Sequence, residues 1–203
     1  MNKNIGILAA WHVEQVENGD LFLPYTHYLY LSFAAIRFDF VWLIAPVTSK
    51  NKPSQGFCKL DLRHIEIVKL PDFTSYFSAQ NSFFSFKRSI EYVAGKVDFF
   101  YCRVPDPFSW MPALISNKPV IMHFVGDTID ATKYNEKWSW LKKKIMIAGY
   151  YPDYLLTLLA ARKSRVYTNG FHLSQKLAKY GVKAIPVISS TIAKSDLTDN
   201  LHE

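Results

Sequence analysis

The polar residues best placed for chemistry follow a short apolar run near the middle of the chain. Residues 119–127 read Pro-Val-Ile-Met-His-Phe-Val-Gly-Asp, apolar except for His123 until the run breaks at Gly126 and Asp127. Such a run is typical of a strand that is buried on both faces of a parallel sheet. Ligands of these sheets bind outside the carboxyl ends of the strands. We therefore predict a site at His123, with Gly126 and Asp127 beside it.

Other polar residues near predicted strand ends have more than one interpretation. Arg103 and Asp106 would contact a charged or sugar ligand, or they would form a surface salt bridge. Asp127 would bind ligand hydroxyl groups, or it would accept a backbone hydrogen bond as the N-cap of the next helix. Glu14 and Glu17 have side chains suited to acid-base chemistry, but we favour a solvated loop at their position.

The strands that must position these residues follow from the hydrophobic pattern. Strands are predicted at residues 5–9, 38–45, 64–70, 97–104, 119–125, 165–168 and 184–188. The strand at 64–70 alternates polar and apolar residues, which places it near a sheet edge. Residues 11–20 are predicted to form a polar loop, and residues 46–62 an irregular excursion.

Helices are predicted between most of these strands. Pro24 suits an initial helical turn, and one face of a 3.6-residue period follows it, made of Tyr25, Tyr28, Leu29, Ser32, Phe33 and Ile36. Further helices are predicted over 83–94, over 105–114 and after Gly170, and residues 134–161 predict two helices broken at 149–152. This alternation indicates one α/β domain over residues 1–190, with a Rossmann-like, doubly wound and mostly parallel sheet, followed by a linker or tail at 191–203.

Composition places the chain among ordered globular proteins. Of its 203 residues, 49% are hydrophobic and 16% aromatic, which is enough to fill a large core. Cys58 and Cys102 form no Cys-x-x-Cys pattern, and we expect both to be core thiols in a reducing compartment. No apolar run approaches the roughly 20 residues that span a bilayer or forms the core of a signal peptide, so we expect a cytoplasmic protein.

Glycine and cysteine spacing excludes several common classes of site. The eight glycines never occur as Gly-x-Gly, so a dinucleotide-binding fingerprint is absent, and no Gly-Lys-Ser or Gly-Lys-Thr marks a P-loop. An ordinary dehydrogenase or NTPase is therefore not expected. The cysteines predict no zinc site, and we expect no metal.

Positive charge is concentrated in one segment of the chain. The formal net charge is +7, and residues 133–165 hold eight basic residues against Glu136 and Asp153. Such an excess suits an anionic partner: lipid head groups, a phosphate-bearing substrate or nucleic acid. Because the chain has no recognisable nucleic-acid-binding module, we expect no nucleic-acid partner.

The same segment predicts a helix with aromatic anchors. One stripe holds Trp138, Leu141, Ile145 and Ala148, and around it lie Trp140, Lys142, Lys143 and Lys144. This combination is typical of a helix at a membrane interface, where a basic residue contributes about 1 kcal/mol at an anionic leaflet. In the alternative interpretation, the stripe packs on the sheet and the lysines are solvated. We favour contact with an anionic membrane surface, and hence peripheral attachment to the inner face of the membrane.

Several segments, taken in order, resemble the N-terminal half of a two-domain (GT-B fold) glycosyltransferase, most of all glycosyltransferase family 4. They are the first strand with its loop containing Gly19, residues 98–105 (Asp-Phe-Phe-Tyr-Cys-Arg-Val-Pro), the strand that carries His123, residues 164–170 (Ser-Arg-Val-Tyr-Thr-Asn-Gly) and the closing residues 185–190. The resemblance covers nearly the whole chain through short motifs.

The resemblance implies a division of labour between two domains. In such enzymes the N-terminal domain binds the acceptor, a C-terminal domain binds the nucleotide-sugar donor through a Glu-x7-Glu-type motif, and a retaining, metal-independent transfer occurs between them. By this resemblance the chain ends where the linker to the donor domain would begin. We therefore expect a C-terminal donor-binding domain as its partner, no cofactor in this chain beyond the donor of the complete enzyme, and no sugar transfer by the chain alone.

The resemblance also implies roles for individual residues. His123 would be the catalytic contact, donating a hydrogen bond to a hydroxyl of the donor sugar. The other substrate-binding residues would be Gly19, Asp20, Arg103, Asp106, Gly126 and Asp127. The acceptor would be a saccharide or a lipid-linked saccharide, as in bacterial surface polysaccharide synthesis. A non-catalytic glycosyltransferase-like module that binds a saccharide or a protein is the alternative.

Overall fold

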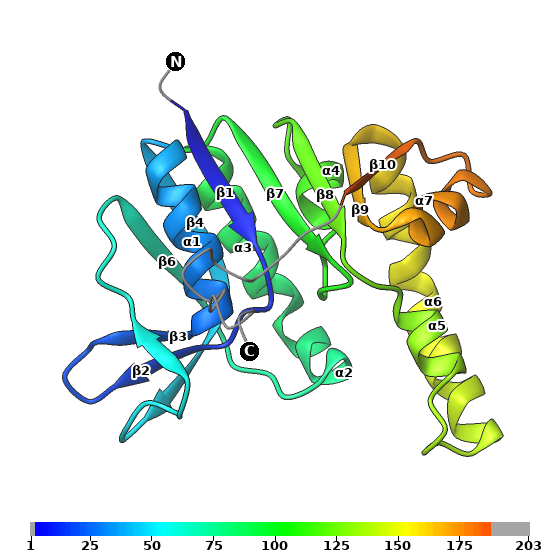
Figure 1. Ribbon diagram of the computed structural model, residues 1–203, viewed down its shortest axis with the longest axis horizontal. Helices are drawn as coiled ribbons and strands as arrows, with labels where there is room; N and C mark the ends of the chain where they lie inside the picture. Colours follow the sequence, from blue (N-terminus) through cyan, green and yellow to red (C-terminus); the bar gives the residue numbers. More distant parts are fainter. Residues whose placement is uncertain (1–2, 188–203) are drawn as a thin grey trace, which may run out of the picture.

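A mostly parallel sheet of ten strands organises residues 3–187, the part of the chain that the computed structural model describes (Figure 1). The strands are β1 (Asn4–Leu8), β2 (Val13–Val16), β3 (Leu21–Pro24), β4 (Phe40–Lys50), β5 (Phe57–Lys59), β6 (Ile65–Leu70), β7 (Phe99–Val104), β8 (Val120–Phe124), β9 (Arg165–Asn169) and β10 (Ala184–Val187). Their order is β10-β9-β8-β7-β1-β4-β2-β3-β5, and β6 pairs with β4. Only the β2–β3 and β3–β5 pairs among them are antiparallel. The predicted fold class is confirmed.

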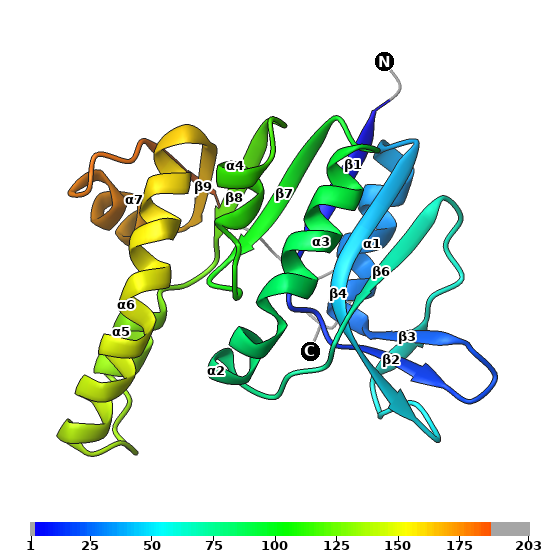
Figure 2. The same cartoon turned by 180° about the vertical axis from the view of Figure 1, so that it is seen from behind.

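Helices cover both faces of this sheet. They are α1 (Tyr25–Arg37), α2 (Tyr76–Ala79), the 3-10 helix η1 (Gln80–Ser82), α3 (Phe83–Ala94), α4 (Met111–Ile115), α5 (Thr128–Lys133), α6 (Trp140–Lys163) and α7 (Phe171–Ala178). Figures 1 and 2, which are opposite views, show α1 on one face and α3 and α6 on the other. This arrangement gives the doubly wound sheet two separate cores.

Strand alternation decides which core each side chain enters. In β1, Leu8 belongs to the core beneath α3, whereas Ile5 and Ile7 belong to the core beneath α1, where Leu31 is fully buried. Successive side chains of a strand point to opposite faces, so the apolar run of β1 serves both cores. A buried side chain of this size contributes about 1.5–3 kcal/mol.

Several sequence predictions are confirmed with small changes of boundary. The strand expected at 119–125 is β8, the helix expected at 83–94 is α3, and the expected edge strand is β6, which pairs with β4 alone. The strand expected at 184–188 is β10, which ends at Val187 within the described residues. Residue 188, the expected domain end at 190 and the expected tail at 191–203 lie outside them.

Two segments expected to be irregular contain strands, so those predictions are wrong for the strand residues and hold for the turns beside them. The expected loop at 11–20 contains β2 and the turn to β3, and the expected excursion at 46–62 contains β5 and the end of β4. The second half of β4 continues past the main sheet and pairs in parallel with β2, from Val13–Val47 to Val16–Lys50. This pairing gives hydrogen-bond partners to backbone N–H and C=O groups of β2 and β4, for which the sequence pattern predicts no partner.

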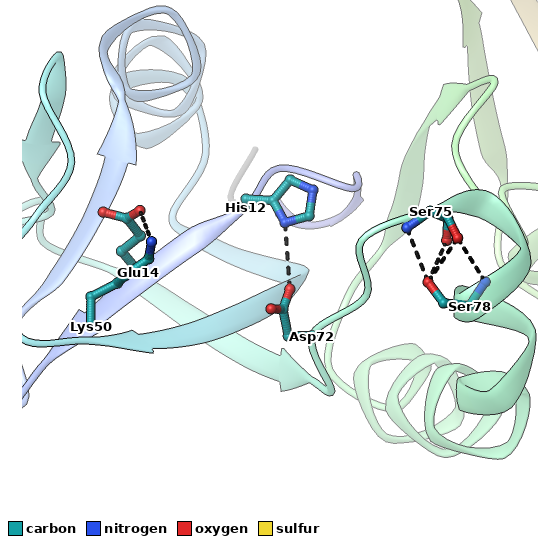
Figure 3. A network of polar contacts seen from close by, with 6 residues as sticks. All are labelled: His12, Glu14, Lys50, Asp72, Ser75 and Ser78. Carbon is teal, nitrogen blue, oxygen red and sulfur yellow. Dashed lines mark hydrogen bonds and ion pairs between the residues drawn. The ribbon is translucent and has the colours of Figure 1, made fainter.

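Glu14 is not in the solvated loop that we expected. Its side chain is buried on β2 and accepts hydrogen bonds from the backbone and the hydroxyl of Ser54, at 2.7 and 2.6 Å. Lys50 lies 3.9 Å away, as Figure 3 shows. The carboxylate therefore fastens the loop before β5 to β2.

Figure 3 also shows how the carboxyl ends of β1 and β6 are joined. His12 lies between β1 and β2, directly before β2, and its Nδ1 is 3.6 Å from Oδ1 of Asp72, just after β6. Beyond Asp72, Ser75 and Ser78 form a capping box, in which each side chain accepts a hydrogen bond from the other's backbone N–H. These contacts begin α2 immediately beside the sheet edge.

The two helices expected within 134–161 are one helix, α6, with Pro152 inside it. Proline cannot donate to the carbonyl four residues earlier, but Ala148 and Pro152 are exposed, so water can solvate that carbonyl. Gly149 is needed for packing and does not end the helix. A Cβ at this position would lie 2.6 Å from Cε1 of Phe77, whose ring stacks on Tyr150.

Three smaller predictions from the sequence differ from the structure. On α1, Phe33 and Ile36 are 62% and 78% exposed, because the helix buries Leu31 instead of the expected face. The helix expected at 105–114 begins only at Met111, since the preceding residues form turns. Cys102 is a buried thiol as expected, but Cys58 is only half-buried.

We predict that Gly6→Ala destabilises the fold. A Cβ at Gly6 would lie 2.7 Å from two ring carbons of Phe100 and 3.1 Å from Val93, inside the core. Overpacking of this kind costs about 1–3 kcal/mol, which urea unfolding would measure as a lower free energy of unfolding. Gly95→Ala is the control, because its Cβ would meet only Tyr92 O at 3.7 Å. Equal losses in both variants would contradict the prediction.

Candidate functional site

A cavity of about 620 Å³ lies on the face of the sheet that carries α1. Its lining residues are Ile5, Ile7, Trp11, Thr26, His27, Tyr30, Ala34, Phe38, Tyr101, Arg103, His123, Val125 and Asn169. They come from β1, β7, β8, β9 and α1, and from three residues beyond these elements: Trp11 after β1, Phe38 after α1 and Val125 after β8. This volume is within the range of about 300–1,000 Å³ that is usual for small-molecule sites.

Register brings the polar side chains of the cavity together. Arg103 on β7 pairs with His123 on β8, and His123 pairs with Tyr167 on β9. Their neighbours Cys102 and Met122 enter the core on the opposite face. Because side chains alternate along each strand, Arg103 and His123 face the cavity side of the sheet. The predicted site residue His123 and the predicted contact Arg103 therefore lie side by side.

Both ring nitrogens of His123 are held by hydrogen bonds. Nδ1 lies 2.6 Å from the hydroxyl of Tyr101, and Nε2 lies 2.8 Å from Oδ1 of Asn169. An amide oxygen only accepts, so Nε2 carries the proton and Nδ1 accepts from Tyr101. Burial lowers the pKa of His123, and the charge of Arg103 adds to this, although the Asn169 bond opposes it. The imidazole is therefore neutral near pH 7 and its orientation is fixed.

Arg103 is fixed by a buried carboxylate. Its Nη1 donates to Oδ1 of Asp106 at 2.7 Å, and Oδ2 of Asp106 accepts from the backbone N–H of Ala10 at 2.8 Å. Burial raises the pKa of Asp106, whereas the charge of Arg103 and the Ala10 bond act to lower it. Asp106 is only 7% exposed, so the pair is a partly buried one and not a surface salt bridge. It ties β7 to the chain after β1 and sets a positive charge at the cavity.

Stacked aromatic rings form the opposite wall. Trp11 stacks on His27 with ring centroids 4.9 Å apart and an interplanar angle of 12°, and Tyr30 lies 6.2 Å from Trp11. Burial lowers the pKa of His27 to about 4, and the charges of Arg103 and His12 add to this. The wall is therefore flat, aromatic and uncharged at neutral pH.

Two nitrogens in this wall have no hydrogen-bond partner among residues 3–187. They are Nε1 of Trp11 and Nδ1 of His27, both buried. An unpaired buried polar group costs about 1–3 kcal/mol, and a ligand group that paired with it would remove that cost. They give the cavity two buried polar groups that a ligand can satisfy, in addition to the already paired Arg103 and His123.

A second, much smaller cavity of about 30 Å³ lies at the same sheet edge and is lined by Asp106, Gly126, Asp127 and Asp153, among others. It has room for about one water molecule. Oδ1 of Asp127 accepts from the backbone N–H of Asp130 and so caps α5, and Oδ2 lies 2.8 Å from Nζ of Lys176. Asp127 was predicted either to bind ligand hydroxyl groups or to cap the next helix, and in the structure it is the N-cap of α5.

Gly19 and Asp20 lie apart from both of these cavities. They form the turn between β2 and β3, where Gly19 has a φ of +87°. Asp20 is paired with Lys59 at 2.7 Å. Neither residue lines the cavity of His123, so the structure does not bring them together with the other predicted contacts. The residues predicted to contact membrane lie on and before α6.

The aromatic wall was missed by sequence reasoning. Trp11 directly follows β1, and His27 and Tyr30 are three residues apart on α1, a spacing that places them on one face of a helix. The position of Trp11 after a strand and the spacing of His27 and Tyr30 on a helix were the features of the sequence that could have indicated this wall. Tyr101 and Asn169 lay inside the two segments already noted, residues 98–105 and 164–170, but nothing in the sequence pairs them with His123.

Residues 3–187 contain neither a metal-binding cluster nor a membrane-spanning helix. No group of three or more histidine, cysteine, aspartate or glutamate side chains there is arranged to hold a metal ion. No helix in the same range is long and apolar enough to cross a membrane.

Comparison with known proteins gives only distant likenesses. No protein-family model matches the sequence, and no curated protein matches it. A UGT transferase from Siraitia grosvenorii, solved in complex with UDP, is 9% identical with a TM-score of 0.47, over 92% of this chain and 50% of that one. UGT73P12 of Glycyrrhiza uralensis, complexed with glycyrrhetinic acid 3-O-monoglucuronide, is 13% identical with a TM-score of 0.44, over 92% and 49%.

The chain thus spans about half the length of these solved structures. Likenesses at this distance assign neither an activity nor a family. The resemblance to family 4 in particular stays a prediction from the sequence.

We predict that acid destabilises the fold partly through His27. Its pKa is about 4 in the folded chain and 6.5 without the fold. Between these values the unfolded chain binds a proton that the folded chain does not, so the free energy of unfolding falls as pH is lowered from 7 to 4. His27→Gln removes this contribution, and urea unfolding across that range should show a shallower fall. The same substitution at exposed His172 is the control, and an unchanged slope in His27→Gln would contradict the prediction.

Proposed function

We propose that this chain is the acceptor-binding part of a glycosyltransferase that transfers a sugar from a nucleotide-sugar donor to a saccharide or lipid-linked saccharide. The observation that carries the proposal is the cavity at the carboxyl edge of the sheet, which combines an aromatic wall with fixed polar groups. The sequence resemblance described above supports it independently.

The chemistry of the cavity suits a sugar. A pyranose ring has one face of C–H groups and a rim of hydroxyls. The C–H face would lie against one side of the stack that Trp11, His27 and Tyr30 form, because aromatic rings give a large apolar contact. The hydroxyls would bond to the unpaired nitrogens of these two residues and to His123 and Asn169. Arg103 would contact an anionic group, such as a phosphate of the donor or of a lipid-linked acceptor.

His123 would act through hydrogen bonding. A sugar hydroxyl that displaced Asn169 would accept the proton on Nε2, while the Tyr101 bond at Nδ1 kept that tautomer. Such a donor helps catalysis only where it meets charge that develops during transfer. In this proposal the donor is held by a second, C-terminal domain that closes over the cavity.

A binding module without catalysis is the second candidate. It is favoured by the observation that both nitrogens of His123 are already paired inside the protein, which leaves this ring no free base. The two candidates share the saccharide site and differ in turnover, so they require two experiments.

The first experiment tests the site. Trp11→Phe keeps an aromatic ring and removes the N–H, and we expect about tenfold weaker saccharide binding in calorimetry against a panel of saccharides and nucleotide sugars. Trp42→Phe is the matched control, because Nε1 of Trp42 is also buried and unpaired but belongs to the opposite core. Equal affinities of the two variants would place the ligand elsewhere.

The second experiment tests the reaction. In the protein as its gene encodes it, we expect transfer from a nucleotide sugar to a lipid-linked acceptor, with His123→Ala reducing kcat/KM at least 100-fold and His172→Ala leaving it unchanged. Transfer that survived His123→Ala would remove the role given to this residue. Saccharide binding without transfer to any acceptor would leave the binding module as the function.

A further inference from the structure

Within the described residues, 3–187, nothing covers an apolar stripe that runs along α6. It buries Tyr150, Thr157 and Leu158 against the domain. The other side exposes Leu141 (60%), Ile145 (63%), Leu155 (45%) and Leu159 (48%), with Ala148 and Pro152 also exposed between them. These positions recur at four and three residues, so they share one side of the helix. At 1.5 Å per residue, the stripe extends over roughly 30 Å.

Aromatic rings and lysines gather at the first end of this stripe. Tyr134 and Trp140 are 74% and 69% exposed. Nζ of Lys144 lies 4.2 Å from the Trp140 ring centroid, and Nζ of Lys142 lies 4.7 Å from that of Trp138. From residue 133 to 144 there are five lysines and one acidic residue, Glu136. This end is therefore apolar, aromatic and strongly positive at once.

The same end projects from the domain. Figures 1 and 2 both show α5 and the first half of α6 extending beyond the carboxyl edge of the sheet, away from the other elements. Exposed apolar stripes on a projecting helix are usually covered by a partner or a membrane. The charge of the helix discriminates between these occupants.

A second copy of the helix does not fit the charge. The basic residues of α6 lie at its two ends, Lys142 to Lys144 at one and Arg162 with Lys163 at the other. Its one acidic residue, Asp153, accepts a hydrogen bond from Trp110 toward the domain. Pairing two copies along the stripe would therefore bring like charges together in either direction, which is unfavourable.

We propose that α6 is an interfacial helix that docks this domain on an anionic lipid surface. Leu141 and Ile145 enter the boundary of the acyl chains, Trp140 and Tyr134 lie at head-group level, and the lysines contact lipid phosphates. The lysine stems cover apolar surface while their ammonium groups reach the head groups. The projecting end brings the carboxyl edge of the sheet, and with it the cavity, toward the membrane. The inference needs only α6 and its charge, so it holds whether or not the cavity binds a saccharide.

Vesicle binding tests the inference. We expect the chain to co-sediment with phosphatidylcholine vesicles that contain 30% phosphatidylglycerol, and to bind pure phosphatidylcholine vesicles far more weakly. Trp11, Trp42 and Trp110 are already buried, so a blue shift of tryptophan fluorescence on binding should come from the α6 end. Trp140→Tyr should reduce this shift.

Two variants separate the contribution of charge from that of the apolar contact. A triple variant that replaces Lys142, Lys143 and Lys144 with Gln should weaken partitioning into the anionic vesicles on the order of 100-fold, because each lysine contributes about 1 kcal/mol to binding. Ile145→Asn should weaken it about tenfold. The controls change exposed residues of the same types elsewhere, namely Lys52, Lys179 and Lys183 to Gln, and Ile36 to Asn. All of these side chains are exposed or nearly so, which keeps the variants folded.

Three outcomes would overturn the inference. One is equal binding to the two kinds of vesicle, or no binding to either. Another is an equal loss of binding in the α6 variants and their controls. The third is a dimer in sedimentation velocity that Ile145→Asn dissociates, which would assign the stripe to a second copy of the chain.

Discussion

The alternation of side chains along the central parallel strands is the constraint on which the rest of the structure depends. In β1, Gly6 faces the core beneath α3, where it lets the ring of Phe100 approach within contact of the backbone, and Ile7 faces the core beneath α1. In β8, Met122 is buried on the first face and His123 faces the second. One strand register therefore fixes two cores and the polar contents of the cavity.

The cavity keeps its polar groups at low electrostatic cost. A buried cation without a partner would cost several kcal/mol, but burial keeps His27 and His123 neutral, and the one charge in the wall, on Arg103, is balanced by Asp106. The remaining cost lies in the unpaired nitrogens of Trp11 and His27. A ligand that paired with these nitrogens would remove this cost, which supports the functional proposal for the cavity.

Two surfaces of different chemistry meet at the carboxyl edge of the sheet. The cavity is enclosed by β1, β7, β8 and α1 and binds through shape and fixed hydrogen bonds. The projecting half of α6 is open, apolar and positive. Along the chain, residues 125–127 lead from β8, beside the cavity, into α5, whose N-cap is Asp127, and α6 follows. Their proximity would place a membrane-borne acceptor near the cavity, if both proposals hold.

The sequence by itself determined the α/β class, the central strand with His123, the edge strand β6 and helix α3, because each depends on local periodicity. It did not determine the pairing of β2 and β5, the burial of Glu14 or the continuity of α6 through Pro152, because these depend on partners distant in the chain. For the same reason the site was predicted only in part. His123 and Arg103 follow from strand ends, whereas Trp11 and His27 meet only when α1 packs on β1. Tertiary structure alone decided which strand-end residues share a cavity.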